Sequence, residues 1–145
     1  MRRAAIALIA VMMCAGYSFG QSNGLPQWKV IKEFHVMDQT AGVPLTILFT
    51  PTQNGLYRLS MYVSASTDIR QLTGWDMFVY WNDQTGLPAQ FLLGADLTGG
   101  STYQADSTLF SPQIGKPVAV YVQTGNPPPQ DASYDFAVVI EKLTH

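Results

Sequence analysis

Nucleophilic catalysis needs an activated serine, cysteine or threonine beside a base, and this sequence offers few partners for such a pair. Its only histidines are His35 and His145, and the second is the last residue, where chains usually fray. Its one cysteine is Cys14, and no Gly-x-Ser-x-Gly elbow occurs after residue 20. Because His35 falls on the polar face of a predicted strand, we interpret it as an exposed side chain and expect no catalytic residue.

Metal and paired-carboxylate chemistry are predicted to be missing as well. Zinc sites use three or four closely spaced ligands, which two distant histidines cannot supply. Asp76, Asp83 and Asp96 carry oxygens of the kind calcium prefers, but no Asp-x-Asp-x-Asp-Gly loop is present, and Asp83 stands where a turn former is expected. The only glutamates, Glu33 and Glu141, are interpreted as charges that discourage sheet aggregation. The sequence predicts no metal, no cofactor and no enzyme.

Aromatic residues are the remaining candidates for a functional site, and the densest group of them lies at residues 75–81. Strand alternation places Trp75 and Trp81 on one face of this segment and Phe78 and Tyr80 on the other, and only one face can point into a core. The second face is covered within the chain, forms a subunit interface, or stacks on sugars beside polar residues. The candidate binding or interface residues are Tyr62, Trp75, Phe78, Tyr80, Trp81, Asn82 and Asp83.

The composition describes one small domain that is poor in charge. The chain has 145 residues and a mass of 15.9 kDa, and 47% of its residues are apolar. Only 12% are charged, against about a quarter in an average soluble domain. A net charge of −2 excludes a nucleic-acid surface that works by neutralising phosphates.

The first 20 residues have the layout of a secretory signal peptide. Arg2 and Arg3 precede an apolar run over residues 4–15, and small residues, Ser18 and Gly20, occupy the positions that a signal peptidase reads. The run is too short for a membrane span, which needs roughly 20 residues, and no later stretch approaches that length. We therefore expect a signal at 1–20, a single domain at 21–145, and a secreted, periplasmic or cell-surface protein without cysteine.

The remainder of the chain has the period-two pattern of β-strands. In residues 56–65, for example, Tyr57, Leu59, Met61 and Val63 share one face. Trp28, Val30, Phe34 and Val36 share a face in residues 28–36, and Tyr134, Phe136, Val138 and Ile140 share one in residues 134–143. Turn-forming clusters at 51–55, 82–86, 98–101 and 125–131 separate the segments. About eight strands are predicted, at 28–36, 45–50, 56–65, 75–81, 90–93, 107–110, 117–123 and 134–143. This spacing indicates an all-β fold, an antiparallel β-sandwich of two packed sheets.

Four passages resemble the jelly-roll globular heads of the complement and tumour necrosis factor superfamily. Residues 48–63 contain a similar sequence of phenylalanine, threonine, proline, turn glycine and aromatic strand, and residues 107–110, 115–122 and 134–136 follow in similar order. The resemblance covers about residues 45–143. It implies a jelly-roll topology and trimers, whereas the collagen-like stalk common in the complement branch is missing and that family's partners and calcium sites do not carry over.

Together these observations predict an exported, non-enzymatic β-sandwich with a structural or binding role. We expect a homo-oligomer, because a monomer so poor in charge would expose an apolar surface to water. The resemblance to jelly-roll heads favours a trimer. Tyr62, Phe78 or Tyr80 is expected at the contact between copies. Alternatives are a carbohydrate-binding module that uses surface aromatics, contact with another surface protein, and a small secreted hydrolase.

Overall fold

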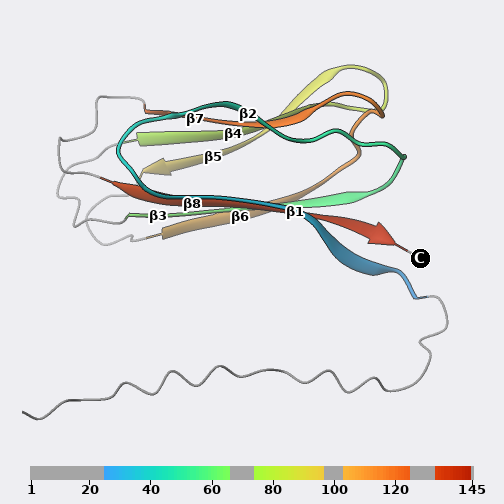
Figure 1. Cartoon of the computed structure of the whole chain (residues 1–145), viewed down its shortest axis with the longest axis horizontal. Helices are drawn as coiled ribbons and strands as arrows, with labels where there is room; N and C mark the ends of the chain where they lie inside the picture. Colours follow the sequence, from blue (N-terminus) through green and yellow to red (C-terminus); the bar gives the residue numbers. More distant parts are fainter. Residues whose placement is uncertain (1–24, 66–73, 97–102, 125–132, 145) are drawn as a thin grey trace, which may run out of the picture.

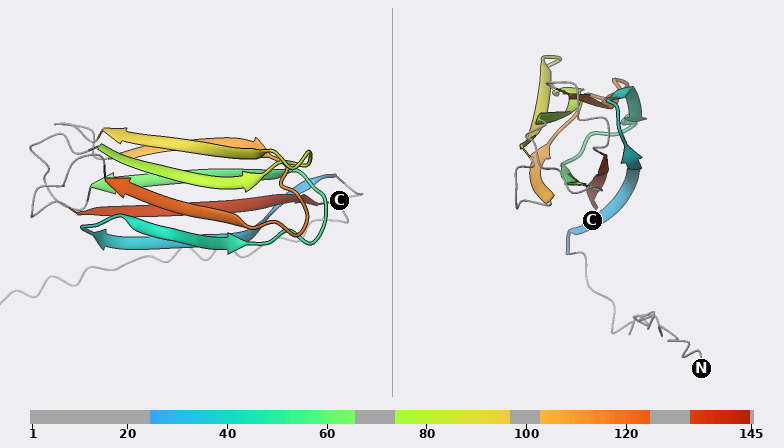
Figure 2. Two further views of the ribbon diagram at one scale, coloured as in Figure 1. Left: turned by 90° about the horizontal axis from the view of Figure 1, so that it is seen from above. Right: turned by 90° about the vertical axis from the view of Figure 1, so that its left-hand side faces the viewer.

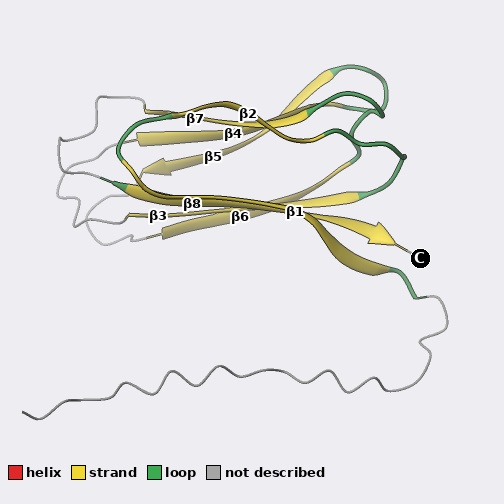
Figure 3. Ribbon diagram, in the orientation of Figure 1, coloured by secondary structure: helices red, strands yellow, loops and turns green. Residues whose placement is uncertain are grey.

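The computed structural model describes residues 25–65, 74–96, 103–124 and 133–144. These residues form eight strands and no helix (Figure 3). Nothing in these ranges is a helix of the length and apolarity that a membrane span needs. The strands are β1 (Gln27–Gln39), β2 (Val43–Phe49), β3 (Tyr57–Ala65), β4 (Gly74–Asn82), β5 (Pro88–Asp96), β6 (Tyr103–Phe110), β7 (Val118–Thr124) and β8 (Tyr134–Thr144).

The strands pair into two antiparallel sheets that face each other (Figures 1 and 2). The first sheet has the order β1-β8-β3-β6, and the second sheet has the order β2-β7-β4-β5. Among the described strands, β4 and β5 are the only consecutive pair within one sheet, because every other connection crosses to the opposite sheet. This arrangement is an eight-stranded jelly roll, so the predicted all-β sandwich of jelly-roll type is confirmed.

The core lies between the two sheets and is built from the alternate residues of each strand that point inward. On β3, Leu59 is completely buried and pairs with Ile140 of β8 and Thr108 of β6. The faces predicted for residues 56–65 and 134–143 are the buried ones. The largest fully buried side chains are Trp75, Tyr134, Phe136, Leu59, Met61, Met77 and Ile140.

The first strand differs from the prediction, which placed Trp28, Val30, Phe34 and Val36 on one face. A register shift between Val30 and Lys32 leaves Ile31 without a partner in β8. Val30 therefore pairs with Glu141 on the exterior and is 47% exposed, whereas Phe34 and Val36 pack against the core. One inserted residue reverses the side to which every later side chain points, and period-two counting cannot detect it.

Strands β5 and β6 extend well past their predicted bounds, as does β1 at its C-terminal end. β5 continues from residue 93, where it was predicted to end, to Asp96, because Gly94 pairs with Asp76 of β4. β6 begins at Tyr103 rather than at residue 107. Backbone pairing needs no apolar side chains, so the polar and small residues of these extensions gave no sign that they form strands. The predicted turns at 98–101 and 125–131, the signal segment at 1–20 and His145 lie outside the described residues.

Three turns meet at one end of the sandwich and hold its strand connections together. The Gly115 amide donates to the Pro51 carbonyl over 2.9 Å, and the Gln113 amide donates to the Asn82 carbonyl over 2.8 Å. Asp83 also forms a bridge with Pro112. Both predicted turn clusters in this region, at 51–55 and 82–86, therefore lie beside the turn at residues 111–117, and they close this end of the core.

Candidate functional site

The residues expected at a site are not gathered in one place. Tyr62 lies on the exterior of the first sheet, whereas Phe78 and Tyr80 lie on the exterior of the second sheet. The core separates these two surfaces. A single contact formed by a flat partner cannot include both, so the two exteriors are separate candidates.

Trp75 is a core residue rather than a surface residue, which corrects its place among the candidates. It is completely buried, and its ring lies 4.9 Å from the ring of Tyr134. Burial raises the pKa of Tyr134 to about 12, and the Tyr134 hydroxyl donates to the Ala41 carbonyl over 2.8 Å. Trp81 points to the same side as Trp75, but it is only half-buried, and it packs 5.0 Å from the ring of Phe110.

Asn82 and Asp83 are used mainly to build the turn that follows β4. Oδ1 of Asp83 accepts hydrogen bonds from the Thr85 amide, the Thr85 hydroxyl and the Leu87 amide, over 2.9, 2.6 and 3.0 Å. The hydrogen bond from the Thr85 side chain is the main reason that the pKa of Asp83 is lowered. The Asn82 amide donates to the Gly86 carbonyl over 3.0 Å. The interpretation of Asp83 as a turn former therefore fits its contacts.

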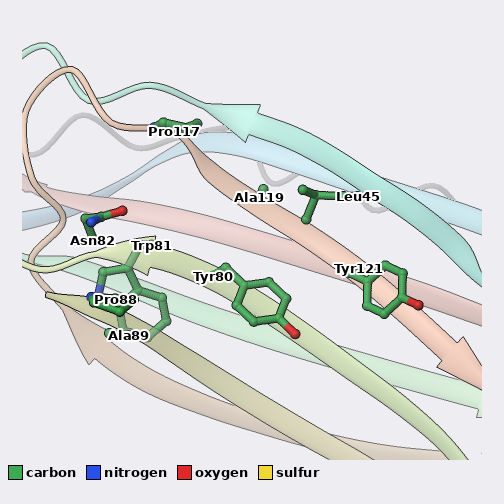
Figure 4. Close-up of a pocket in the computed structure, with 9 residues that line it drawn as sticks. All are labelled: Leu45, Tyr80, Trp81, Asn82, Pro88, Ala89, Pro117, Ala119 and Tyr121. Atoms are coloured by element: carbon green, nitrogen blue, oxygen red, sulfur yellow. The ribbon is translucent and has the colours of Figure 1, made fainter.

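A groove runs across the exterior of the second sheet (Figure 4). We call it the tyrosine groove, because Tyr80 of β4 and Tyr121 of β7 project into it. It is open to solvent and its volume is about 520 Å³. The residues that line it are Leu45, Tyr80, Trp81, Asn82, Pro88, Ala89, Pro117, Ala119 and Tyr121.

Tyr121 was missed as a candidate residue, although a signal for it was present. In β7, Val118, Val120 and Val122 are buried, so alternation alone places Tyr121 on the exterior. Tyr121 pairs with Phe78 on the neighbouring strand β4, and no local sequence pattern predicts this pairing. The Phe78 ring lies 5.6 Å from the Tyr80 ring and 6.3 Å from the Tyr121 ring, at interplanar angles of 16° and 29°. The three rings form an aromatic row across two strands.

The exterior of the first sheet carries a second exposed surface, which we call the Tyr62 face. Tyr62 and Tyr103 are 43% and 61% exposed, and their rings stack at 6.0 Å. Leu109 is 57% exposed on the same side. Small side chains occupy much of the space between them and leave a shallow hollow. The Tyr62 face consists of Ser60, Tyr62, Tyr103, Ala105, Ser107, Leu109, Ala137 and Val139. Met61 and Asp106 also line the hollow, and the Asp106 carboxylate accepts a hydrogen bond from the Ser107 amide.

Beside this face, one ion pair stands against an aromatic ring. Nε of Arg58 donates to Oε2 of Glu141 over 2.6 Å, and the Arg58 guanidinium lies 4.9 Å from the centre of the Trp28 ring. The hydrogen bond from Arg58 is the main reason that the pKa of Glu141 is lowered. The two charges compensate each other, so they add little net charge at the edge of the Tyr62 face.

The remaining polar candidates form no compact site. Nε2 of His35 lies 3.9 Å from Oε2 of Glu33, and both side chains are more than half exposed on β1. In the part of the chain that the structure describes, no three histidine, cysteine or acidic side chains are grouped so as to hold a metal ion.

Comparison with known proteins finds likeness only among solved structures. Neither a family model nor a curated protein sequence matches the chain. A chain of the VP2 subviral particle of infectious bursal disease virus is 14% identical with a TM-score of 0.42, and the match covers 80% of this chain and 32% of that one. A structure of the Gx strain of the same virus is 16% identical with a TM-score of 0.40, covering 96% and 36%. This chain therefore spans about a third of the length of those chains. The resemblance to complement and tumour necrosis factor heads stays a prediction beyond the confirmed topology.

Proposed function

We propose that this chain is an exported, non-enzymatic structural domain that self-associates through the Tyr62 face. The observation that carries the proposal is the pattern of β6. Gln104, Asp106 and Thr108 pair with buried residues of β3 and share their inward side with the buried Phe110, whereas Tyr103, Ala105, Ser107 and Leu109 are turned outward. Three of these four outward side chains are apolar or aromatic, whereas a strand whose exterior faced only water would carry mostly polar side chains there. A second copy of the domain is the partner that would cover this exterior.

The edges of the sheets favour association through a face rather than through an added strand. On β2, the Thr46 hydroxyl donates to the Pro44 carbonyl over 2.8 Å, and on β6 the Ser107 amide donates to Asp106 Oδ1 over 2.7 Å. β5 begins with Pro88, and β1 is interrupted by register shifts. These are features with which proteins block edge-to-edge pairing.

The composition of the Tyr62 face also fits a contact between copies. Tyrosine is enriched in protein interfaces, and charged residues are depleted in their centres. Small side chains such as Ala105 and Ala137 let a second sheet approach closely. Closed symmetry is the usual way to cover such a face, and the resemblance to jelly-roll heads favours three subunits over two.

The absence of catalysis is part of the proposal and is supported by the surroundings of the candidate groups. His35 and Glu33 are solvated, and a general base works best in a preorganised site that excludes water. The carboxylate of Asp83 is engaged by its own turn. A panel of hydrolase substrates is expected to show no turnover. Turnover that Ser60→Ala or Asp83→Ala abolished would contradict this part of the proposal.

Light scattering over a concentration series tests self-association. The chain from Gln21 to His145 holds all eight strands, and it should have a mass of about three chains at high micromolar concentration. Leu109→Glu should lower the mass to that of one chain, because it places a charge in the contact. Ile47→Glu is the matched control, because Ile47 is 63% exposed on the opposite sheet. A wild-type mass of one chain, or dissociation by Ile47→Glu alone, would refute the proposed contact.

Export has a separate test. Protein recovered from the periplasm or the medium of an expressing bacterium should begin at Gln21, because the proposed signal ends at Gly20. A chain that stays in the cytoplasm with residues 1–20 attached would contradict export, while leaving the proposal of self-association intact.

A further inference from the structure

We propose that the tyrosine groove binds a neutral saccharide, whose pyranose rings stack on Tyr80 and Tyr121. The site lies on the second sheet, on the side of the core opposite the Tyr62 face. It therefore goes beyond the proposed self-association and does not depend on it. Ligand binding and assembly would use separate surfaces of one sandwich.

The hollow of the groove arises from one small residue between large ones. Ala119 pairs directly with Tyr80 of β4 and with Ile47 of β2, and it is 6% exposed. Its methyl group forms the floor, while Leu45 and the ring of Tyr80 stand on either side (Figure 4). The volume of about 520 Å³ falls within the roughly 300–1,000 Å³ of small-molecule sites.

The two tyrosine rings present flat surfaces to the groove. Figure 4 shows the rings of Tyr80 and Tyr121 broadside rather than edge-on. The Phe78 ring contacts both of them and is inclined by 16° to the Tyr80 ring and by 29° to the Tyr121 ring. The face of an aromatic ring carries a partial negative charge, and it attracts the polarised C–H groups on the apolar side of a pyranose. Because the rings project from paired strands rather than loops, their positions are fixed before a ligand arrives.

The polar character of the groove specifies an uncharged ligand with hydroxyl groups. None of the nine described residues that line it carries a charge at neutral pH. The hydroxyls of Tyr80 and Tyr121 form no hydrogen bond within the described part of the chain, so both remain available. The Asn82 amide nitrogen is engaged by Gly86, which leaves the side-chain oxygen of Asn82 as an acceptor. Such groups match the hydroxyls of a sugar, and the described lining offers no positive charge to a phosphate or a carboxylate.

Isothermal titration calorimetry with neutral hexasaccharides tests the site. The probes are cellohexaose, xylohexaose, maltohexaose and the hexamer of N-acetylglucosamine, and the protein is the chain from Gln21 to His145. We expect saturable binding of at least one probe. Ala119→Leu fills the groove and Tyr121→Ala removes a ring, so each should weaken binding about tenfold or more. Tyr121→Phe keeps the ring and should lose only a few-fold, and it serves as the second variant should Ala119→Leu fail to fold.

Trp28→Ala is the matched control, because it removes an aromatic side chain of the first sheet that belongs neither to the tyrosine groove nor to the Tyr62 face. It should leave saccharide affinity unchanged. The proposal is overturned if no probe binds, if Trp28→Ala weakens binding as much as Tyr121→Ala, or if Tyr121→Ala leaves binding unchanged. It is also overturned if Ala119→Leu dissociates the oligomer in light scattering, because the groove would then be a contact between copies. A monomeric wild type that binds saccharide would refute self-association alone.

Discussion

Two leucines on neighbouring strands of the first sheet provide the sharpest test of which face is buried. Leu59 of β3 is completely buried, whereas Leu109 of β6 is 57% exposed. Leu59→Ala leaves a cavity inside the core, which destabilises proteins by about 2–5 kcal/mol. This loss should be the same at every protein concentration, because the cavity forms within one chain.

Leu109→Ala should behave differently, because the exposed part of this side chain becomes buried only on assembly. Full burial of a leucine contributes about 1.5–3 kcal/mol, so covering the 57% that is exposed contributes about 0.9–1.7 kcal/mol per subunit. In the single chain the substitution should lower the free energy of unfolding by at most about 1.3 kcal/mol, because only the part of the side chain that is already covered is lost. The larger effect should appear only where the protein is associated.

Urea unfolding followed by tryptophan fluorescence measures both effects. It is run at one concentration below and one above the association midpoint found by light scattering. A loss of less than about 1 kcal/mol for Leu59→Ala would refute the packing of the two sheets. A loss for Leu109→Ala that equals that of Leu59→Ala at the lower concentration would refute the assignment of the exterior.

Three further outcomes follow from individual contacts. Burial raises the pKa of Tyr134 from 10.0 to about 12, so the stability that its neutral form contributes is complete below pH 10 and is lost as the pH rises toward 12. Urea unfolding midpoints measured over this pH range should show the loss, and the Tyr134→Phe variant should not show it. Because Arg58 lowers the pKa of Glu141, the stability of that pair is present above the ordinary glutamate pKa and is lost as the pH falls through the lowered value, so Glu141→Gln should flatten the acid side of the same profile. Gly42→Ala should lower the thermal unfolding midpoint, because the added Cβ would overlap a backbone carbonyl of β7. Gly94→Ala is the control and should change the midpoint little, because its Cβ would meet its nearest atom at 3.7 Å. Equal midpoints for the two variants would contradict the close approach of β2 to β7.

Much of the candidate site was visible as residue types but not as an arrangement. The aromatic segment 75–81 made Phe78 and Tyr80 candidate residues, and strand alternation correctly placed them on the face opposite to Trp75 and Trp81. Which face lies on the exterior depends on the first sheet, because Tyr134 of β8 packs against Trp75, which is completely buried. Tyr121 entered the groove only because β7 pairs with β4, two strands separated by about forty residues of sequence. The reversed polarity of β6 likewise has meaning only beside the buried residues of β3.

By itself, the sequence determined the all-β class and the position of most strands, because side-chain alternation and turn chemistry are local properties of the chain. It also determined that Leu59 and its neighbours on β3 face inward, since their period is unbroken. Only the tertiary structure decided the register. The bulge at Ile31 reversed the faces of β1, and strand pairing set Ala119 beside Tyr80 to hollow out a groove. Contacts between distant strands depend on how whole sheets align, and a shift of one residue moves every side chain to the other face.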